Sequence, residues 1–195
     1  MSGGKNVAVL PGSYDPITLG HMDIIERGAL LYDELVIGVS ENSSKRPHLS
    51  IDERLDLIRL LTRNCPNIRA EKFTGMTVEF AKRIGARVIL RGIRTFADFE
   101  YEFQLALANK RLGGVETVFI MSSAERSFIR STLIKEAVAL GGDVSAFVPA
   151  PVAEALRRNL EKRGKISVRG YVGLDGEETP SIGTDGSGLR GEAIE

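Results

Sequence analysis

The chain has 195 residues, a length that favours one domain with room for an appendage. Its residues are 43% apolar and 27% charged, as is usual for a globular protein in water, and this length allows a core of useful size. Since 26 basic residues balance 26 acidic ones, bulk charge excludes an electrostatic argument for binding nucleic acid.

Several features bear on the location of the protein. No apolar run approaches the roughly 18 residues that span a bilayer, and the first residues lack the pattern of a secretion signal. The single cysteine, Cys65, has no partner for an internal disulfide, which is typical of a reducing compartment, and we expect it to be inert. We therefore predict a cytoplasmic protein that does not bind membranes.

Short β-type runs alternate with helical patterns over residues 1–163, which we expect to form one domain. In chain order, the expected strands are residues 7–10, 35–40, 68–73, 88–91 and 117–121. The expected helices begin near His21 and Ser50 and then span residues 77–84, 96–112, 132–140 and 152–163. Ser50 with Glu53 forms a capping box, and Gly85, Gly113 and Gly141 are expected to end three of the helices.

This alternation predicts a doubly wound, five-stranded parallel α/β sheet. The strands are short and rich in Val, Ile and Phe, so we expect them to be buried on both faces. In such sheets ligands bind beyond the carboxyl ends of the strands, where the strand order reverses. Function is therefore expected in the loops that follow the strands.

Residues 164–195 differ from the rest of the chain. They are rich in glycine, and from Asp175 onward acidic residues outnumber basic ones, so we expect a flexible tail. A short strand at residues 166–171 has weak support. The GxGxxG pattern at residues 186–191 lacks the flanking strand and helix that pyrophosphate binding needs. The sequence has no P-loop motif either, so we expect phosphate to be bound in another way.

The loop after the first strand carries the strongest chemical signal, in the segment from Gly12 to His21. Gly12 allows a close backbone approach to a ligand, Asp15 and Pro16 fix a bend, and Thr18 can cap the next helix. A helix start is an anion site, and it favours a neutral His21 that can donate one hydrogen bond to a phosphoryl oxygen. Taken alone, a histidine that only packs under the turn is the simpler interpretation.

The loops after the other strands carry matching groups. Lys45 follows the second strand, and Arg91 and Arg94 follow the fourth, where two arginines around a glycine can form bidentate forks to phosphate. Ser131 and Thr132 follow the fifth strand, where they could cap a helix or hold a polyphosphate. Each of these residues could also be a solvent-exposed residue without a binding role. The phosphate-binding interpretation is favoured because the loops lie at the same edge of the sheet.

The residues of these loops resemble a known family. Thr18-Leu19-Gly20-His21 resembles the (H/T)xGH motif of the nucleotidyltransferase superfamily, and residues 129–135 resemble its second signature. The match is nearest to bacterial phosphopantetheine adenylyltransferases, through PGSYDPITLGH, RGIRTFADFEYEFQLALANKRL, ETVFIM and STLIKE in the same order and spacing. The resemblance covers residues 6 to about 163 and implies a Rossmann-like nucleotidyltransferase fold.

The resemblance implies transfer of the adenylyl group of ATP to 4′-phosphopantetheine, giving dephospho-coenzyme A and pyrophosphate, with His21 stabilising the transition state. It implies contacts to phosphopantetheine from Ser13, Lys45, Thr77 and Arg91. It implies contacts to ATP from Ser13, Tyr14, His21, Gly92, Ile93, Arg94, Glu102, Arg126, Ser127, Phe128, Ile129, Arg130, Ser131 and Thr132. It further implies magnesium, a homohexamer and feedback inhibition by coenzyme A. A phosphate nucleophile is already anionic, so positioning and charge stabilisation are enough for catalysis, and Mg²⁺ is expected to be carried by ATP.

Three positions depart from the family pattern. Many members carry tryptophan in place of Arg126 and serine in place of Arg130. Thr77 stands where an apolar residue is common, so it would contact substrate through its backbone or serve as a helix cap. Two other hypotheses stay open: a transferase that uses nicotinate mononucleotide or a CTP-dependent alcohol phosphate, and a nucleotide-binding regulator without catalysis.

Overall fold

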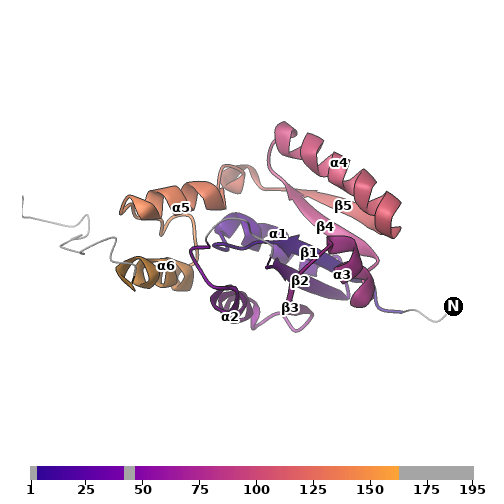
Figure 1. The fold of residues 1–195 in the computed structure, drawn as a ribbon, viewed down its shortest axis with the longest axis horizontal. Coiled ribbons are helices and arrows are strands. Elements are labelled where there is room, and N and C mark those ends of the chain that lie inside the picture. The colour runs from indigo at the N-terminus through magenta and orange to yellow at the C-terminus, as the bar shows by residue number, and fades with distance from the viewer. Residues whose placement is uncertain (1–3, 42–46, 163–195) are drawn as a thin grey trace, which may run out of the picture.

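The computed structural model describes residues 4–41 and 47–162. Its centre is a five-stranded parallel sheet, with the strands in the order β3-β2-β1-β4-β5 (Figure 1). The strands are β1 (Val7–Gly12), β2 (Glu34–Ser40), β3 (Ile68–Phe73), β4 (Val88–Ile93) and β5 (Glu116–Met121). The predicted Rossmann-like α/β sheet is confirmed, and the chain reverses its direction of winding between β1 and β4.

Helices cover both faces of the sheet (Figure 1). They are α1 (Leu19–Ala29), α2 (Ile51–Thr62), α3 (Thr77–Arg83), α4 (Phe96–Gly113), α5 (Ser131–Ala139) and α6 (Ala150–Lys162), with a short 3-10 turn at Ala124–Arg126. None of the helices among the described residues is long and apolar enough to cross a membrane.

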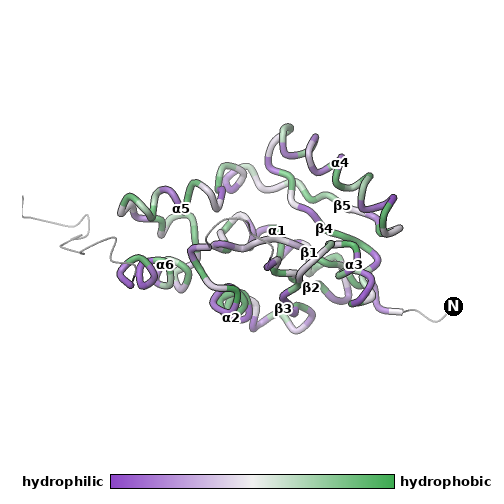
Figure 2. The backbone as a smooth tube through the Cα atoms, viewed as in Figure 1, coloured by the Kyte–Doolittle hydropathy of each residue, from purple (hydrophilic) through white to green (hydrophobic). Residues whose placement is uncertain are grey.

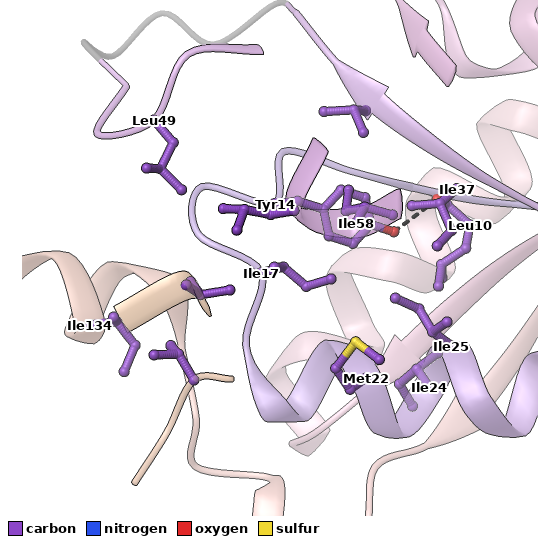
Figure 3. Close-up of a cluster of buried hydrophobic side chains, with 14 of the residues drawn as sticks. Leu10, Tyr14, Ile17, Met22, Ile24, Ile25, Ile37, Leu49, Ile58 and Ile134 are labelled. Carbon is purple, nitrogen blue, oxygen red and sulfur yellow. Dashed lines mark hydrogen bonds between the residues drawn. The ribbon is translucent and has the colours of Figure 1, made fainter. Parts of the chain in front are cut away.

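The strand side chains divide into two cores because successive residues point to opposite faces. On β1, Ala8 and Leu10 join the larger core, which α1, α2, α5 and α6 complete. Val7 and Val9 join the smaller core, where α3 supplies Phe80, stacked on Phe73 with 4.5 Å between the ring centroids. Figure 3 shows part of the larger core around Tyr14 and Ile17.

Several sequence expectations about the fold were wrong in detail. Strand β4 continues to Ile93, so Arg91 lies in the strand and not in the loop after it, and the edge strand β3 is only partly buried. The edge strand β5 is not buried on both faces, since Val118 is 36% and Met121 59% exposed. Helix α4 ends one residue later than expected, because Gly114 (φ 68°), not Gly113, takes the left-handed conformation at its C-terminus. The capping box of Ser50 and Glu53 on α2 is confirmed. The expected tail and the weak strand at 166–171 lie outside the described residues.

Candidate active site

A cleft of about 440 Å³ lies at the carboxyl ends of β1 and β4, where the winding reverses. Its walls are the start of α1 and the first turns of α4. The predicted site residues that line it are Ser13, Tyr14, His21, Arg91, Gly92, Arg94, Glu102, Ile129 and Arg130. The structure therefore brings together, at one sheet edge, residues from three of the loops that the sequence singled out.

His21 is held by the start of its own helix. Thr18 is the N-cap of α1, and its hydroxyl accepts a hydrogen bond from the backbone N–H of His21 at 3.3 Å. In return, the backbone N–H of Thr18 donates to Nδ1 of His21 at 3.0 Å. This is a capping box in which a histidine takes the place usually held by Glu or Gln. Since Nδ1 is an acceptor here, the proton of the neutral ring is on Nε2.

The ring of His21 is neutral over the physiological range. Burial, together with the positive charges of Arg94 and Arg91, lowers the pKa of His21 from 6.5 to about 4. The prediction of a neutral His21 agrees with this, but the causes are burial and two arginines rather than the helix start alone. His21 lines the cleft and can therefore offer one N–H from an uncharged group.

The turn before α1 divides its residues between the core and the cleft. Tyr14 is 2% exposed, has a left-handed backbone (φ 49°), and donates its hydroxyl to the Leu10 carbonyl at 2.9 Å (Figure 3). Gly12 leaves room for this ring, because a Cβ there would lie 3.0 Å from it. Ser13 is exposed. Ligand contact at this turn is thus available to the Ser13 hydroxyl and the backbone, while the Tyr14 hydroxyl is already used.

Arg91 is tied to α4. Its Nε donates to one carboxylate oxygen of Glu102 at 2.7 Å, its Nη2 donates to the other, and its Nη1 donates to the Pro11 carbonyl at 2.7 Å. Burial by itself lowers the pKa of Arg91, but the hydrogen bonds and charge of Glu102 outweigh this and raise it. The bidentate contact of the Arg91 guanidinium is therefore made with the carboxylate of Glu102, whereas the sequence suggested a bidentate contact with phosphate.

Arg94 is tied to the same helix. Its Nε donates to Asp98 at 3.2 Å, and its Nη1 donates to the Ile129 carbonyl at 3.3 Å. A guanidinium has five N–H groups, so Arg91 and Arg94 keep further donors beyond these contacts. Gly92 between them allows β4 to approach α1, since a Cβ at Gly92 would lie 2.8 Å from Ile24.

The loop before α5 closes over the start of α1. Ser131 donates its hydroxyl to the Pro16 carbonyl at 2.9 Å, and Arg126 donates to the Leu19 carbonyl at 3.3 Å. The N-cap of α5 is Arg130, so Ser131 is not the cap that the sequence allowed. Arg130 lines the cleft.

The rest of this loop and its neighbours lie outside the cleft lining. The predicted ATP contacts that do not line it are Ile93, Arg126, Ser127, Phe128, Ser131 and Thr132. Ile93 is 1% exposed, and its carbonyl accepts from the Ser122 N–H at 2.8 Å. Phe128 is 57% exposed and packs edge-on against Phe147.

Some of the predicted phosphopantetheine contacts line the cleft and others do not. Ser13 and Arg91 line the cleft, and Thr77 does not. Thr77 is the first residue of α3, whose N-cap is Met76, so its interpretation as a cap was wrong. Lys45 lies outside the described residues.

The sequence did not predict two buried charged residues, Asp15 and Arg54, that hold the loops around the cleft in place. Asp15, 5% exposed, accepts from the backbone N–H groups of His48 at 3.0 Å and Leu49 at 2.9 Å. Arg54, 3% exposed, donates to the carbonyls of Ser13 at 2.7 Å and Ser40 at 3.4 Å. The sequence showed Asp15 only as a turn residue, and nothing in it marked Arg54.

The lining residues limit the chemistry of the cleft. They supply cationic guanidinium groups and a neutral N–H donor, and the carboxylates of Asp98 and Glu102 are engaged by those guanidiniums. No group of three or more His, Cys, Asp or Glu residues in the described ranges could hold a metal ion. Such a site suits phosphate binding and charge stabilisation at phosphorus, the chemistry of nucleotidyl transfer.

Comparison with known families supports the assignment of the chain to the nucleotidyltransferases. Residues 9–137 match the model of the cytidylyltransferase-like family, so the fold and the site define a nucleotidyltransferase. Phosphopantetheine adenylyltransferase of Caldanaerobacter subterraneus is 48% identical to the chain over 157 residues, covering 80% of this chain and 98% of the relative. That of Desulforudis audaxviator is 46% identical over 160 residues, covering 82% and 98%. The chain belongs to the phosphopantetheine adenylyltransferase family.

Solved structures agree on the fold. A bifunctional NMN adenylyltransferase/ADP ribose pyrophosphatase from Francisella tularensis superposes with a TM-score of 0.65 at 11% identity, covering 83% of this chain and 52% of that one. At this identity the likeness concerns the fold alone.

Proposed function

We propose that the chain transfers the adenylyl group of ATP to 4′-phosphopantetheine, reversibly, giving dephospho-coenzyme A and pyrophosphate as a step of coenzyme A synthesis. The observation that carries the proposal is the neutral His21, whose Nδ1 accepts from Thr18 and whose pKa is lowered to about 4. The choice of acceptor is supported by relatives that are 46% to 48% identical and carry the name phosphopantetheine adenylyltransferase.

The reaction needs no covalent enzyme intermediate. An oxygen of the phosphopantetheine phosphate attacks the α-phosphorus of ATP, and the bond from that phosphorus to the bridging oxygen breaks. The electron pair leaves with pyrophosphate. The attacking oxygen is already anionic, so no base has to remove a proton.

His21 stabilises the charge that develops during this step. Its Nε2–H donates to a non-bridging oxygen of the α-phosphate, and this hydrogen bond is strongest when that oxygen carries most charge. Because the ring is neutral and its Nδ1 is engaged by Thr18, His21 keeps its proton throughout. Arg91 and Arg94, which also line the cleft, add positive charge.

We assign the contacts that the resemblance implies, with modes of contact that fit the geometry. Ser13, Lys45, Thr77 and Arg91 bind phosphopantetheine, with Thr77 acting through its backbone. The ATP contacts in the cleft come from Ser13, Tyr14, His21, Gly92, Arg94, Glu102, Ile129 and Arg130. Ile93 and the residues Arg126, Ser127, Phe128, Ser131 and Thr132 complete the ATP site, with Ile93 contributing its backbone.

We propose that Mg²⁺ enters with ATP rather than on a cage of protein ligands. The carboxylates of Asp98 and Glu102 are hydrogen-bonded to Arg94 and Arg91, so they do not fit a resident metal site. When bound through phosphate oxygens, Mg²⁺ neutralises charge on the triphosphate. We further propose a cytoplasmic homohexamer that is inhibited by coenzyme A, and a domain that ends near residue 163.

Release of pyrophosphate tests the reaction. Wild-type protein with ATP and Mg²⁺ is given 4′-phosphopantetheine, nicotinate mononucleotide or nicotinamide mononucleotide, and in a parallel series CTP with an alcohol phosphate. We expect turnover only with ATP and phosphopantetheine, and its loss in His21→Ala. Turnover with another acceptor alone would replace the assigned substrate, and no turnover with any of them would favour a non-catalytic regulator.

A matched pair of lysine variants tests the one binding residue outside the described ranges. We expect Lys45→Ala to raise the KM for phosphopantetheine, because it removes a phosphate ligand. The exposed Lys72, which pairs with Asp52 on the surface, provides the control Lys72→Ala. Equal KM values in the two variants would remove Lys45 from the site.

A further inference from the structure

Tyr14 combines a strained backbone with a buried side chain. Among the described residues it is the one residue other than glycine with a positive φ, at 49°, where its Cβ crowds the backbone. It is 2% exposed, although Ser13 before it lies at the surface. Strain of this kind persists only where the surrounding structure holds it, and it gathers at functional sites. The side chain of Tyr14 is therefore a candidate for a role in the cleft.

The ring of Tyr14 lies beside the ring of His21. The two ring centroids are 5.1 Å apart, and the ring planes are inclined at 60° to each other. This separation is within the range of direct aromatic contact. The hydrogen bond from the Thr18 N–H holds one edge of the imidazole at Nδ1. The Tyr14 ring provides a second contact, which limits how far the imidazole plane can tilt.

The Tyr14 ring is itself fixed in place. Its hydroxyl donates to the Leu10 carbonyl at 2.9 Å, and burial raises the pKa of this hydroxyl, so it stays protonated. The ring belongs to the larger core, to which β2 and α2 supply Ile37 and Ile58 (Figure 3). Figure 2 shows apolar residues along both of these elements. A Cβ at Gly12 would lie 3.0 Å from the ring, so the glycine makes room for it.

We propose that Tyr14 is a positioning residue for His21. Its ring holds the imidazole plane so that Nε2–H points at the α-phosphate, and it keeps water away from the buried side of the imidazole. ATP then meets the backbone of Tyr14, while the side chain serves His21. The part that concerns the α-phosphate rests on the proposed function, and the contact between the two rings does not.

The surroundings of His21 show what removal of the Tyr14 ring should do. Burial is the largest cause of the lowered pKa of His21, ahead of the positive charges of Arg94 and Arg91. Water admitted beside the imidazole raises this pKa, while the two arginines still hold it below 6.5. The charged groups around the ring, which the variants below leave unchanged, are Arg91 and Arg94 at the end of β4, Asp98 and Glu102 on α4, Arg130 at the start of α5, Arg126 beside the start of α1, and Asp23 on α1.

Nuclear magnetic resonance of protein labelled on histidine tests the contact. The chain has two histidines, and the signal that is missing in His21→Gln belongs to His21. We expect Tyr14→Leu and Tyr14→Met to raise the pKa of His21 from about 4 toward 6.5. Tyr14→Phe keeps the ring, so the pKa should stay low. Wild type should also show a nuclear Overhauser effect between the ring protons of Tyr14 and His21, which needs no variant.

Pyrophosphate release tests the positioning. We expect Tyr14→Leu and Tyr14→Met to lower kcat roughly 100-fold, the scale of a misplacement of about 1 Å. The KM values for ATP and phosphopantetheine should stay within about twofold of wild type, because the groups that bind substrate are unchanged. Tyr14→Phe should lower kcat only about threefold, since it loses one hydrogen bond. A rise of KM in step with the fall of kcat would assign Tyr14 to the structure of the turn and overturn the proposal.

The matched control is Tyr32→Leu. Tyr32 also packs against the larger core but does not line the cleft, so the pKa of His21 and kcat should stay at their wild-type values. Far-UV circular dichroism establishes that each variant is folded.

The two measurements also separate this proposal from the proposed function. A missing Overhauser effect in wild type overturns the proposal, as does an unchanged pKa of His21 or an unchanged kcat in Tyr14→Leu. A loss in Tyr14→Phe as large as that in Tyr14→Leu does the same. If wild type has no turnover with any acceptor but the resonance results are as expected, the proposed function fails and the contact between Tyr14 and His21 stands.

Discussion

The two walls of the cleft are built in different ways. The α1 wall is fixed locally: Thr18 and His21, three residues apart, cap each other, and Met22, Ile24 and Ile25 anchor the helix in the core. The α4 wall is fixed between two elements: Arg91 on β4 is held by Glu102 on the helix that follows it, and most of α4 faces solvent.

This difference has a consequence for how each wall responds to change. The histidine is placed by its own turn, so its orientation survives changes elsewhere in the molecule. The arginines are placed by carboxylates on a helix with little buried surface of its own. A substitution in the α1 wall should therefore lower the activity of the protein and leave its stability nearly unchanged. A substitution in the α4 wall should lower both the stability and the activity.

The largest expected effect breaks the α4 wall. Arg91→Met leaves the buried Glu102 without its partner, and we expect the free energy of unfolding to fall by about 3–5 kcal/mol in a urea titration. The double variant Arg91→Met/Glu102→Leu removes both charges and should recover most of that loss. Turnover should remain absent in both variants, because the cleft then lacks the guanidinium of Arg91 and keeps only those of Arg94 and Arg130. Recovery of turnover in the double variant would show that Arg91 only holds Glu102.

The next effect separates the two roles of His21. His21→Gln keeps a capping-box residue at this position, so we expect its stability to stay near wild type, whereas His21→Ala loses the reciprocal bond to Thr18. Both variants should lose about 3–4 kcal/mol of barrier stabilisation, measured as kcat in pyrophosphate release, because the aimed ring N–H is gone. Wild-type kcat in His21→Gln would assign His21 to capping alone.

The lowered pKa of His21 predicts a pH dependence with a definite sign. Between about pH 4 and pH 6.5 the unfolded chain binds a proton at this ring and the folded chain does not, so stability falls as pH falls through that window. Comparing urea titrations at pH 7 and pH 5, wild type should lose on the order of 1–2 kcal/mol more than His21→Gln. Equal losses would mean that the folded ring has an ordinary pKa.

The smallest effect compares the caps of the two walls. Thr18 caps α1 and Thr95 caps α4, each by accepting a backbone N–H three residues on, at 3.3 Å and 3.2 Å. Replacing either by Ala should lower stability by about 1 kcal/mol. Only Thr18→Ala should also lower kcat, because its hydroxyl lies 3.0 Å from Nδ1 of His21. A matching loss of kcat in Thr95→Ala would show that both walls depend on their helix starts.

The features that the sequence by itself predicted correctly depend mostly on neighbours a few residues apart, although its helix caps at Thr77 and Ser131 were wrong. It predicted the five parallel strands, the Thr18 cap, the neutral His21 and the family, because periodicity, caps and motifs are local patterns. It also assigned the residues of three loops to one edge of the sheet, since parallel strands present their carboxyl ends together.

Only the tertiary structure decided which groups those residues meet. The pairing of Arg91 with Glu102, the inward hydroxyl of Tyr14, and the support from Asp15 and Arg54 link elements whose contact depends on how helices pack on the sheet. A sequence shows that an arginine is present at a strand end. The sequence does not show whether the guanidinium of that arginine binds a phosphate or a carboxylate of the protein. The packing decides this, because a charged group that is buried is stable only when it is paired with an opposite charge nearby.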